Sequence, residues 1–456
     1  MKDYHAAIIN KWIFSYSIKL RKGDFKSQMG EAIQNQTLTR DEIRNLQFEK
    51  LGELIQHAYN FVPYYRDTFK QIGLSPQDIR TWEDFENLPI LTKAQVREYN
   101  QKFLSEKQRT PLRKYKTSGS TGTPLRVFTS EISIAAEYAV RYRALNYYGV
   151  NIGDRVVQIR DADRYPHKTG WKKAINIRLY QPFKNFIFNR SMLPESNISE
   201  EDLELHWQYL IVHKPAYISG HSSALHYLAR YIDDRGYDGG SLGMKLITVG
   251  GEKLFDFQEE TLERVFKCPV ADIYGSFEIG IAACSYPCGA LHTNDDFVIM
   301  EVIKSSPEDE YGQIIATRLD NWEFPLIRFN VEDLAPRLET HHDCSLNLPF
   351  QKVDQIIGRH HDQIKLANGR VVRATYFSRL LRNIPGILHY QVNQRELDRF
   401  EILAVIDEGK YSTEGASTIK DRMNATFGPL EVTITPVPTI PSEASGKFRV
   451  VRSDLV

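Results

Sequence analysis

The feature that most limits the possible folds is an alternation of strand-like and helix-like patterns in the middle of the chain. Apolar runs typical of buried strands lie at residues 155–159, 246–249 and 270–274. Helical patterns at residues 201–212 and 222–233 separate them. Strands that alternate with helices predict a parallel sheet with helices on both faces, and therefore an α/β protein.

The segments on either side of this region predict different architectures. Residues 1–100 have mainly helical patterns, with Thr92 as an N-cap. Strand patterns in close succession at 297–303 and 312–318 predict a small antiparallel β subdomain or barrel. A further set of short helices and strands near the C-terminus predicts a small α+β domain. We therefore expect a large N-terminal domain over residues 1–357 and a C-terminal domain over residues 358–456.

Composition excludes several classes of protein. The 456 residues include 58 Lys and Arg and 58 Asp and Glu, and this balance argues against nucleic acid as a partner. Four cysteines are too few for a disulfide scaffold. The N-terminus lacks the pattern of a signal peptide, and no apolar run has the length needed to insert into a membrane. We expect a soluble, cytoplasmic protein; its oligomeric state cannot be predicted from the sequence.

A loop rich in hydroxyl groups and glycine carries the strongest chemical signal. Residues 116–124, KTSGSTGTP, hold five Ser or Thr side chains and two glycines in nine residues. Glycine allows backbone N–H groups to approach an anion closely, and hydroxyls and a lysine add donors for phosphate oxygens. The loop does not match the P-loop pattern. It predicts a polyphosphate-binding site; the alternative is a flexible linker.

This loop resembles the phosphate loop of the adenylate-forming (acyl-CoA synthetase) superfamily. Further segments resemble the motifs of that superfamily in order: GGEKL, YGSFE, PLIRFNVEDLA, Gly358-Arg359 and Ser445-Gly446-Lys447. The N-terminal segments HAYNFVPYYR (57–66) and LPILTK (88–93) are similar to the phenylacetate–CoA ligase branch, and within it to the CapK-like capsule polysaccharide biosynthesis proteins. The resemblance covers nearly the whole chain.

The resemblance implies a reaction in two halves. A carboxylic acid attacks ATP, with Mg²⁺, to give acyl-AMP and pyrophosphate, and an acceptor then displaces AMP. The acceptor is CoA, an amine or a sugar, in surface polysaccharide or small-metabolite biosynthesis. The alternative is a catalytically reduced descendant that binds nucleotide and acts as a scaffold or binding component of a polysaccharide pathway.

The resemblance also implies roles for individual residues. Lys447 and Glu278 would be catalytic, with Lys447 reaching the α-phosphate and Glu278 holding Mg²⁺. Asp333 would bind the ribose, Tyr274 would stack on the adenine, and Arg359 would contact ribose or phosphate. The other nucleotide-binding candidates are Thr117, Ser118, Gly119, Ser120, Thr121, Gly122, Thr123, Gly251, Glu252 and Gly275. The alternative roles are ordinary ones: surface charges, a helix N-cap or a core tyrosine.

Four positions depart from the family pattern. Phe277 replaces a Thr or Ser, so one hydroxyl donor to the α-phosphate is lost. Asn330 and Glu332 replace an arginine and a glycine of the ribose segment. His361 stands where the hinge residue between the two domains is normally an aspartate. These departures bear more on CoA ligation than on ATP use.

The cysteines predict a metal site. Cys284, Cys288, His292 and Cys344 would form a tetrahedral structural zinc site, and some members of this branch carry zinc at a similar place. The alternative is that these cysteines are reduced and packed in the core as small hydrophobic residues.

The acyl substrate is the least constrained part of the prediction. By analogy its pocket includes His221, Gly250 and Gly280. The segment 160–164, RDADR, is unusually charged for the end of a strand, where the ligand crevice of such sheets lies. It indicates a polar or amino-acid-like acid; the alternative is a solvated loop.

Overall fold

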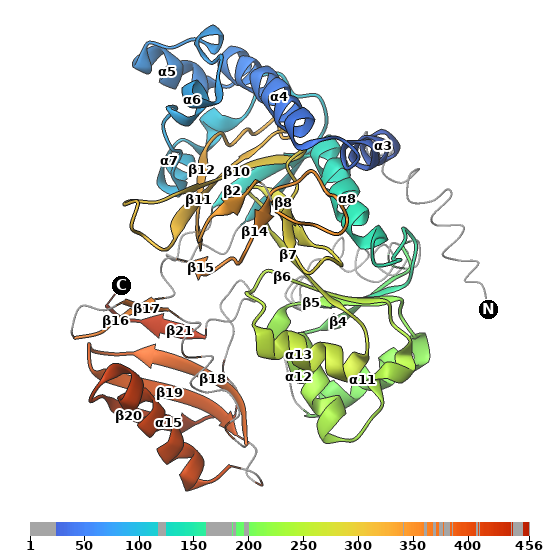
Figure 1. The fold of residues 1–456 in the computed structure, drawn as a ribbon, viewed down its shortest axis with the longest axis vertical. Coiled ribbons are helices and arrows are strands. Elements are labelled where there is room, and N and C mark those ends of the chain that lie inside the picture. The colour runs from blue at the N-terminus through green and yellow to red at the C-terminus, as the bar shows by residue number, and fades with distance from the viewer. Residues whose placement is uncertain are drawn as a thin grey trace, which may run out of the picture. The chain divides into compact units, whose positions relative to one another are not determined.

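The computed structural model describes most of the chain (Figure 1). The described residues are 24–116, 125–160, 185, 188–195, 200–340, 342–359, 363–367, 371–373, 377, 384, 386–406, 409, 411–438, 440 and 450–455. The chain divides into two compact units: residues 1–254 with 260–356, and residues 255–259 with 357–456. Among the helices in the described ranges, none is both long and apolar enough to cross a bilayer.

A nine-stranded mixed sheet forms the centre of the first unit, in the order β13-β14-β9-β8-β7-β6-β5-β3-β4. Neighbouring strands from β7 to β4 are parallel, and the pairs from β7 to β13 are antiparallel. The parallel half consists of β3 (Val156–Arg160), β4 (Arg190–Pro194), β5 (Tyr217–Gly220), β6 (Leu246–Gly250) and β7 (Val270–Ser276). The antiparallel half consists of β8 (Gly280–Ser285), β9 (Leu291–Thr293), β13 (Leu338–Glu339) and β14 (Lys352–Val353).

Apolar cores cover both faces of the parallel half. Neighbouring residues of each strand point to opposite faces, so each strand contributes to both cores. Val157 and Ile218 join one core with apolar residues of α11 (Glu200–His213), α12 (Ser222–Asp234) and α13 (Asp256–Phe266). Val156 and Tyr217 join a second core that includes Leu145 of α8 (Glu131–Asn146). The predicted α/β class, with strands and helices in these positions, is confirmed.

Helices precede the sheet in the chain: α3 (Phe25–Asn35), α4 (Arg40–Phe61), α5 (Pro63–Ile72), α6 (Trp82–Glu86) and α7 (Lys93–Glu98), with short 3₁₀ turns at Pro76–Asp78, Asn100–Phe103 and, later, Gly239–Leu242. Helix α4 ends where Pro63 begins α5, because proline is tolerated in a first helical turn but not in a helix interior. Thr92 is the N-cap of α7 and forms a capping box with Gln95, as the sequence predicts.

A smaller antiparallel arrangement completes the first unit. Strand β11 (Gly312–Arg318) pairs with β10 (Val298–Ile303) and with β12 (Phe329–Ala335), which confirms the predicted antiparallel subdomain. Strands β1 (Leu112–Lys116) and β2 (Arg126–Ser130) form a separate antiparallel pair on either side of residues 117–124.

The second unit has its own sheet and core. Strands β18 (Ile387–Gln394), β19 (Arg399–Ile406), β20 (Glu431–Pro436) and β21 (Val451–Ser453) are ordered β20-β19-β18-β21. Helix α15 (Thr413–Phe427) contributes Ile419 and Met423 to the core of this unit. Strands β16 (Gln363–Lys365) and β17 (Val371–Arg373) form an antiparallel pair. Strand β15 (Gly358–Arg359) lies at the start of the unit.

Candidate active site

Several of the predicted site residues follow directly after parallel strands. His221 follows β5, Gly251 and Glu252 follow β6, and Tyr274 lies near the end of β7. The carboxyl ends of parallel strands meet at one edge of a sheet, and ligands of open α/β sheets bind outside that edge. The strand order therefore brings these residues, separated in sequence, to one side of the sheet.

The residues predicted to bind adenosine are in direct contact. The Tyr274 hydroxyl donates a hydrogen bond of 2.9 Å to Oδ2 of Asp333 on β12. The register of β12 against β11 shifts beside Asp333, between the pairs of Asn330 and Leu334. Such an irregularity changes the direction of a side chain next to a binding site.

Two departures from the family pattern have structural roles in this irregular stretch. Glu332 has a φ of 69°, in the left-handed region where glycine is favoured, which accounts for the glycine usual there in the family. The Asn330 side chain accepts a 2.8 Å hydrogen bond from the Glu332 backbone N–H and donates one to Gln313. The asparagine therefore stabilises the backbone that leads into Asp333.

The N-terminal LPILTK segment supports the same stretch of β12. Leu91 forms a parallel bridge with Phe329. The ammonium of Lys93 donates to the Val331 carbonyl at 2.8 Å and pairs with Glu332 at 2.9 Å. These contacts give a physical reason for this motif to occur together with the ribose segment, and the sequence alone did not predict them.

Glycine is required where β7 turns into β8. A Cβ on Gly275 would meet the carbonyl oxygen of Gly280 and the Cα of Ile281, which is backbone that cannot move aside. The loop between them carries Glu278, which is buried, and its backbone N–H donates to Ser276 Oγ at 3.3 Å. The close crossing of the two strands fixes the position of this loop.

Phe277, which replaces a hydroxyl residue of the family, is 40% exposed. It stacks on Tyr115 of β1, with ring centroids 4.6 Å apart and an angle of 13° between the rings. Tyr115 directly precedes the predicted phosphate loop, residues 116–124. The lost hydroxyl is thus replaced by an aromatic contact to the strand that enters that loop.

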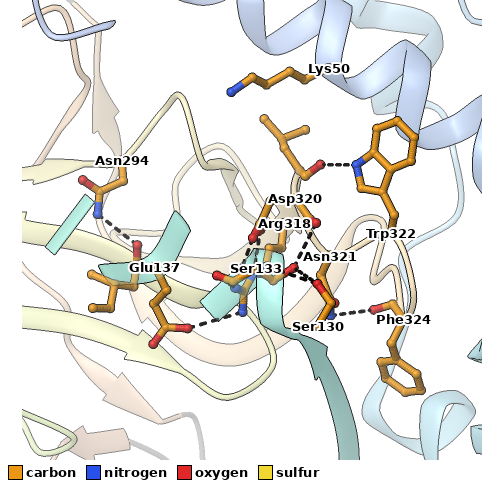
Figure 2. Close-up of polar contacts among 12 residues, drawn as sticks. Lys50, Ser130, Ser133, Glu137, Asn294, Arg318, Asp320, Asn321, Trp322 and Phe324 are labelled. Atoms are coloured by element: carbon orange, nitrogen blue, oxygen red, sulfur yellow. Dashed lines mark hydrogen bonds and ion pairs between the residues drawn. The ribbon is translucent and has the colours of Figure 1, made fainter. Parts of the chain in front are cut away.

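The strand and helix that follow the predicted phosphate loop are also held in place. Figure 2 shows Arg318, at the end of β11, beside Asp320 and residues of α8, the helix that follows β2. The Arg318 guanidinium pairs with Asp320 at 2.7 Å and with Glu137 at 3.6 Å, and it donates to the Ser133 carbonyl at 2.9 Å. Ser133 Oγ donates to the Asp320 carbonyl at 2.9 Å. This network fixes α8, and therefore the end of the β1–β2 pair, against β11.

A second group of polar side chains lies at the far end of the same sheet edge. Nδ1 of His221 is 2.8 Å from both carboxylate oxygens of Glu195, the first residue after β4. Glu252 completes the group, with ligand atoms of the three residues within 4.8 Å of one another. Burial lowers the pKa of His221, but the hydrogen bond to Glu195 and the charges of Glu252 and Glu195 outweigh it, so the pKa is raised. The imidazole is thus held toward its charged form.

The structure brings three of the four predicted metal ligands together. Nε2 of His292 lies 3.3 Å from Sγ of Cys288 and 3.6 Å from Sγ of Cys344. The prediction of Cys284 as a ligand is wrong: this buried side chain lies outside the group, and its Sγ is 3.8 Å from the Asn294 amide nitrogen. The cross-strand pairing of Cys284 with His292 does not bring the two side chains into one ligand set.

A residue that the sequence prediction missed lies beside this group. The ring of His342 is 4.9 Å from that of His292, and within the described part of the chain both of its ring nitrogens are buried without a hydrogen-bond partner. Two cysteine sulfurs with one or two imidazoles form a donor set typical of structural zinc, so these residues fit the metal. In the sequence, the position of His342 two residues before Cys344 was the signal that could have identified it.

Some predicted residues cannot be placed. Residues 117–123 of the phosphate loop, Lys447 and the predicted hinge residue His361 lie outside the described residues. Arg359 ends β15, and the position of its side chain is not described. Gly250 ends β6 and Gly280 begins β8, so both flank the residues discussed above.

Comparisons with known proteins agree with this arrangement. Residues 364–454 match the family described as CapK C-terminal domain. The chain is 23% identical to protein CapK of Staphylococcus aureus, over 96% of this chain and 98% of that protein. It is 25% identical to phenylacetate-coenzyme A ligase of Thermus thermophilus, over 91% and 97%.

Solved structures show the same fold. 2-Hydroxyisobutyryl-CoA ligase, in the postadenylation state with 2-HIB-AMP, matches with a TM-score of 0.73 at 18% identity, over 92% of this chain and 91% of that one. The open conformation of that ligase, with 2-HIB-AMP and CoA, matches with a TM-score of 0.59.

The fold is that of the solved adenylate-forming ligases. Over nearly its whole length the chain is similar to CapK and to the phenylacetate–coenzyme A ligases, the branch that the sequence motifs predict, and residues 364–454 match the CapK C-terminal domain.

Proposed function

We propose that the protein activates a carboxylic acid with ATP through an acyl-AMP intermediate and transfers the acyl group to CoA. The observation that carries this proposal is the contact between Tyr274 and Asp333 beside the carboxyl edge of the parallel sheet. A carboxylate held there accepts hydrogen bonds from ribose hydroxyls, and the tyrosine ring offers a face for the adenine. The names of the relatives, phenylacetate-coenzyme A ligases among them, support CoA as the acceptor.

Adenylation then depends on the placement of charge around the phosphates. In this proposal Glu278 holds Mg²⁺, and the hydroxyls and backbone of residues 117–123 bind the phosphate oxygens, with Gly251 and Glu252 beside the nucleotide. Lys447 stabilises the negative charge that builds up as the carboxylate attacks the α-phosphate. Such positioned charges act without a covalent intermediate on the protein.

The two half-reactions require two arrangements of the chain. We propose that residues 358–456 form a mobile domain that brings Lys447 to the nucleotide and later leaves room for the acceptor. Arg359 to Asp362 would serve as the hinge, because a hinge needs only a few residues that absorb a change in φ and ψ. Arg359 would contact the ribose or a phosphate in one of the two arrangements.

The biological setting follows from the relatives. The similarity to protein CapK supports a role in surface polysaccharide biosynthesis, in which an amine or a sugar would replace CoA as the acceptor. We propose a cytoplasmic location for this reaction, where ATP and CoA are available.

We also propose a structural zinc ion held by Cys288, His292 and Cys344. Zinc would connect the turn between β8 and β9 to the distant loop that carries Cys344. The ion would stabilise the fold and take no part in adenylation.

Pyrophosphate release with a panel of acids tests the main proposal. Lys447→Ala should lower the rate of acyl-AMP formation by about 10²- to 10³-fold or more. Preformed acyl-AMP should still react with CoA. Lys420→Ala, an exposed lysine on α15, is the matched control and should leave both half-reactions unchanged. ATP binding without pyrophosphate release from any acid would instead support a binding role, and the proposed activity would be wrong.

The hinge has a separate test. His361→Pro fixes φ near −65° and removes an N–H, so it should block one half-reaction selectively. Wild-type rates in both half-reactions would show that the chain does not move at this segment.

A further inference from the structure

Two residues near the start of β12 hold a backbone conformation that residues other than glycine rarely adopt. Arg328, directly before the strand, has a φ of 50°, and Glu332, within the strand, has a φ of 69°. Such conformations carry a free-energy cost and persist only where the surrounding contacts enforce them. The residue after Glu332 is Asp333, the carboxylate of the proposed ribose contact, and the following inference rests on that proposed function.

Arg328 is anchored to the segment of chain that precedes α7. Its guanidinium donates to the backbone carbonyls of Glu86 and Leu88, and it pairs with the Glu301 carboxylate at 2.7 Å. Its backbone N–H donates to Thr317 Oγ1 at 2.8 Å. The guanidinium is buried, and these groups satisfy its charge and its donors. They hold the first strained residue in place.

The backbone between the two strained residues pairs with the same segment. The Leu91 N–H donates to the Arg328 carbonyl at 2.9 Å, and the Asn330 N–H donates to the Leu91 carbonyl at 2.8 Å. Leu91 is buried, and a hydrogen bond is stronger there than in water. The start of β12 is therefore braced along its length by residues from the N-terminal part of the chain.

Lys93 and Asn330 hold both polar groups of the peptide that joins Val331 to Glu332. The Lys93 ammonium donates to the Val331 carbonyl at 2.8 Å, and the Asn330 side chain accepts from the Glu332 N–H at 2.8 Å. The same ammonium pairs with the Glu332 carboxylate at 2.9 Å. The peptide plane and the direction of the Glu332 side chain are thus held together, and these two directions determine φ at Glu332.

We propose that Lys93 and Asn330 are positioning residues for nucleotide binding, because they direct the Asp333 carboxylate toward the ribose. A change of φ at Glu332 would turn the next residue, and with it the carboxylate, away from the Tyr274 hydroxyl that donates to it at 2.9 Å. Lys93 acts through the backbone of β12 and makes no contact with the ribose. Glycine at position 332 would adopt the same φ without this support.

Equilibrium binding of ATP and of 2′,3′-dideoxy-ATP, measured by titration calorimetry, tests this role. The two nucleotides differ only in the ribose hydroxyls, so the ratio of their Kd values reports the contact with Asp333. Wild-type protein should bind ATP about tenfold more tightly or better, since hydrogen bonds to a charged acceptor are lost in the analogue. Lys93→Met keeps the aliphatic stem and removes the ammonium. It should lower the ratio by about fivefold, through weaker binding of ATP alone.

Lys102→Met is the matched control, because this lysine lies in the same N-terminal part of the chain and its side chain is 52% exposed. It should keep the wild-type ratio. An unchanged ratio in Lys93→Met, or equal weakening of both nucleotides, would overturn the positioning role, with thermal unfolding used to verify that the variant is folded. Wild-type protein without any preference for ATP would contradict the ribose contact itself, and the proposed nucleotide site with it.

A second substitution tests the route through the backbone. Adding Glu332→Gly to Lys93→Met should restore the preference for ATP to within about twofold of wild type, because glycine needs no support at this φ. Asn330→Ala releases the Glu332 N–H and should lower the ratio as Lys93→Met does, and Glu332→Gly should restore it there as well. Folded double variants that remain as impaired as the single ones would show that Lys93 does not act through Glu332, and the proposal would be wrong.

Discussion

The two halves of the nine-stranded sheet bring their candidate functional side chains together in different ways. In the parallel half every strand ends at the same edge, so single residues that follow β4, β5, β6 and β7 meet there although the chain separates them widely. In the antiparallel half successive strands end at opposite edges. Its Cys/His group instead combines Cys288 and His292 of one hairpin with Cys344 from a distant loop.

The difference shows how strand direction separates function from stability within one sheet. A shared edge brings side chains from several strands together, which suits a substrate site. A hairpin closed by a remote loop gives a small, partly buried set of ligands, which suits a structural ion. Substitutions in the parallel half should therefore change kinetics, and those in the antiparallel half should change the free energy of unfolding.

Loss of the metal is the change with the largest expected effect. Cys344→Ser should remove about one zinc per chain and lower the free energy of unfolding by about 4 kcal/mol or more. Adenylation below the melting temperature should persist, because the ligands lie outside the proposed nucleotide site. Elemental analysis and thermal unfolding measure both effects. Cys284→Ser, which removes a cysteine outside the ligand group, should retain the metal; metal loss in this control but not in Cys344→Ser would reverse the assignment.

Gly275→Ala acts at the boundary between the two halves, where β7 and β8 cross closely. The added methyl group meets backbone atoms, so the free energy of unfolding should fall by about 3 kcal/mol and pyrophosphate release should fall with it. Chemical denaturation and a pyrophosphate assay measure the two losses. Wild-type stability would mean that the crossing tolerates a side chain, and that the two halves are less tightly connected than their geometry indicates.

Asp333→Ala should act on kinetics alone. Loss of hydrogen bonds from the ribose to a charged acceptor is worth about 1.5–3 kcal/mol, which corresponds to a rise of about 10- to 100-fold in the KM for ATP. The relative rates for different acids should not change, since Asp333 is proposed to contact the ribose and not the acid. Steady-state kinetics at several ATP concentrations decide this, and a change in acid preference would contradict the assignment of Asp333 to the ribose.

Tyr274→Phe should have the smallest effect. It removes the 2.9 Å hydrogen bond to Asp333 but keeps the ring, so the KM for ATP should rise by only about fivefold, or about 1 kcal/mol. Tyr274→Ala removes the ring as well and should be clearly worse. Equal kinetics for the two variants would mean that the ring does not bind the adenine.

The sequence predicts the parts of this molecule that depend on local patterns. Apolar runs and helix caps place β3, β6, β7 and the helices between them, because burial on both faces leaves a continuous apolar signal. Strand β4 was missed because its sequence, RSMLP, is polar and only partly buried at the edge of the sheet. Without β4, Glu195 could not be placed beside His221.

The metal ligands show the same limit. Spacing along the chain favoured Cys284, since it is close to Cys288 and His292 in sequence. The direction of each side chain decides which residues lie near the predicted metal group. Cys284 points toward Asn294, whereas His342 lies beside His292. Cysteine and histidine close together in the sequence predict a metal site, but the tertiary fold decides which of them lie within reach of one another.

The support that LPILTK gives to β12 has a consequence for the order of events during synthesis. The Lys93 ammonium and the Val331 carbonyl that it contacts are 238 residues apart in the chain. A loop of that length closes at an entropic cost before the contact contributes any stability. The backbone around Asp333 can therefore form only after the chain beyond that residue has been synthesised. Nucleotide binding should appear late in synthesis, and ATP cannot assist the folding of shorter nascent chains.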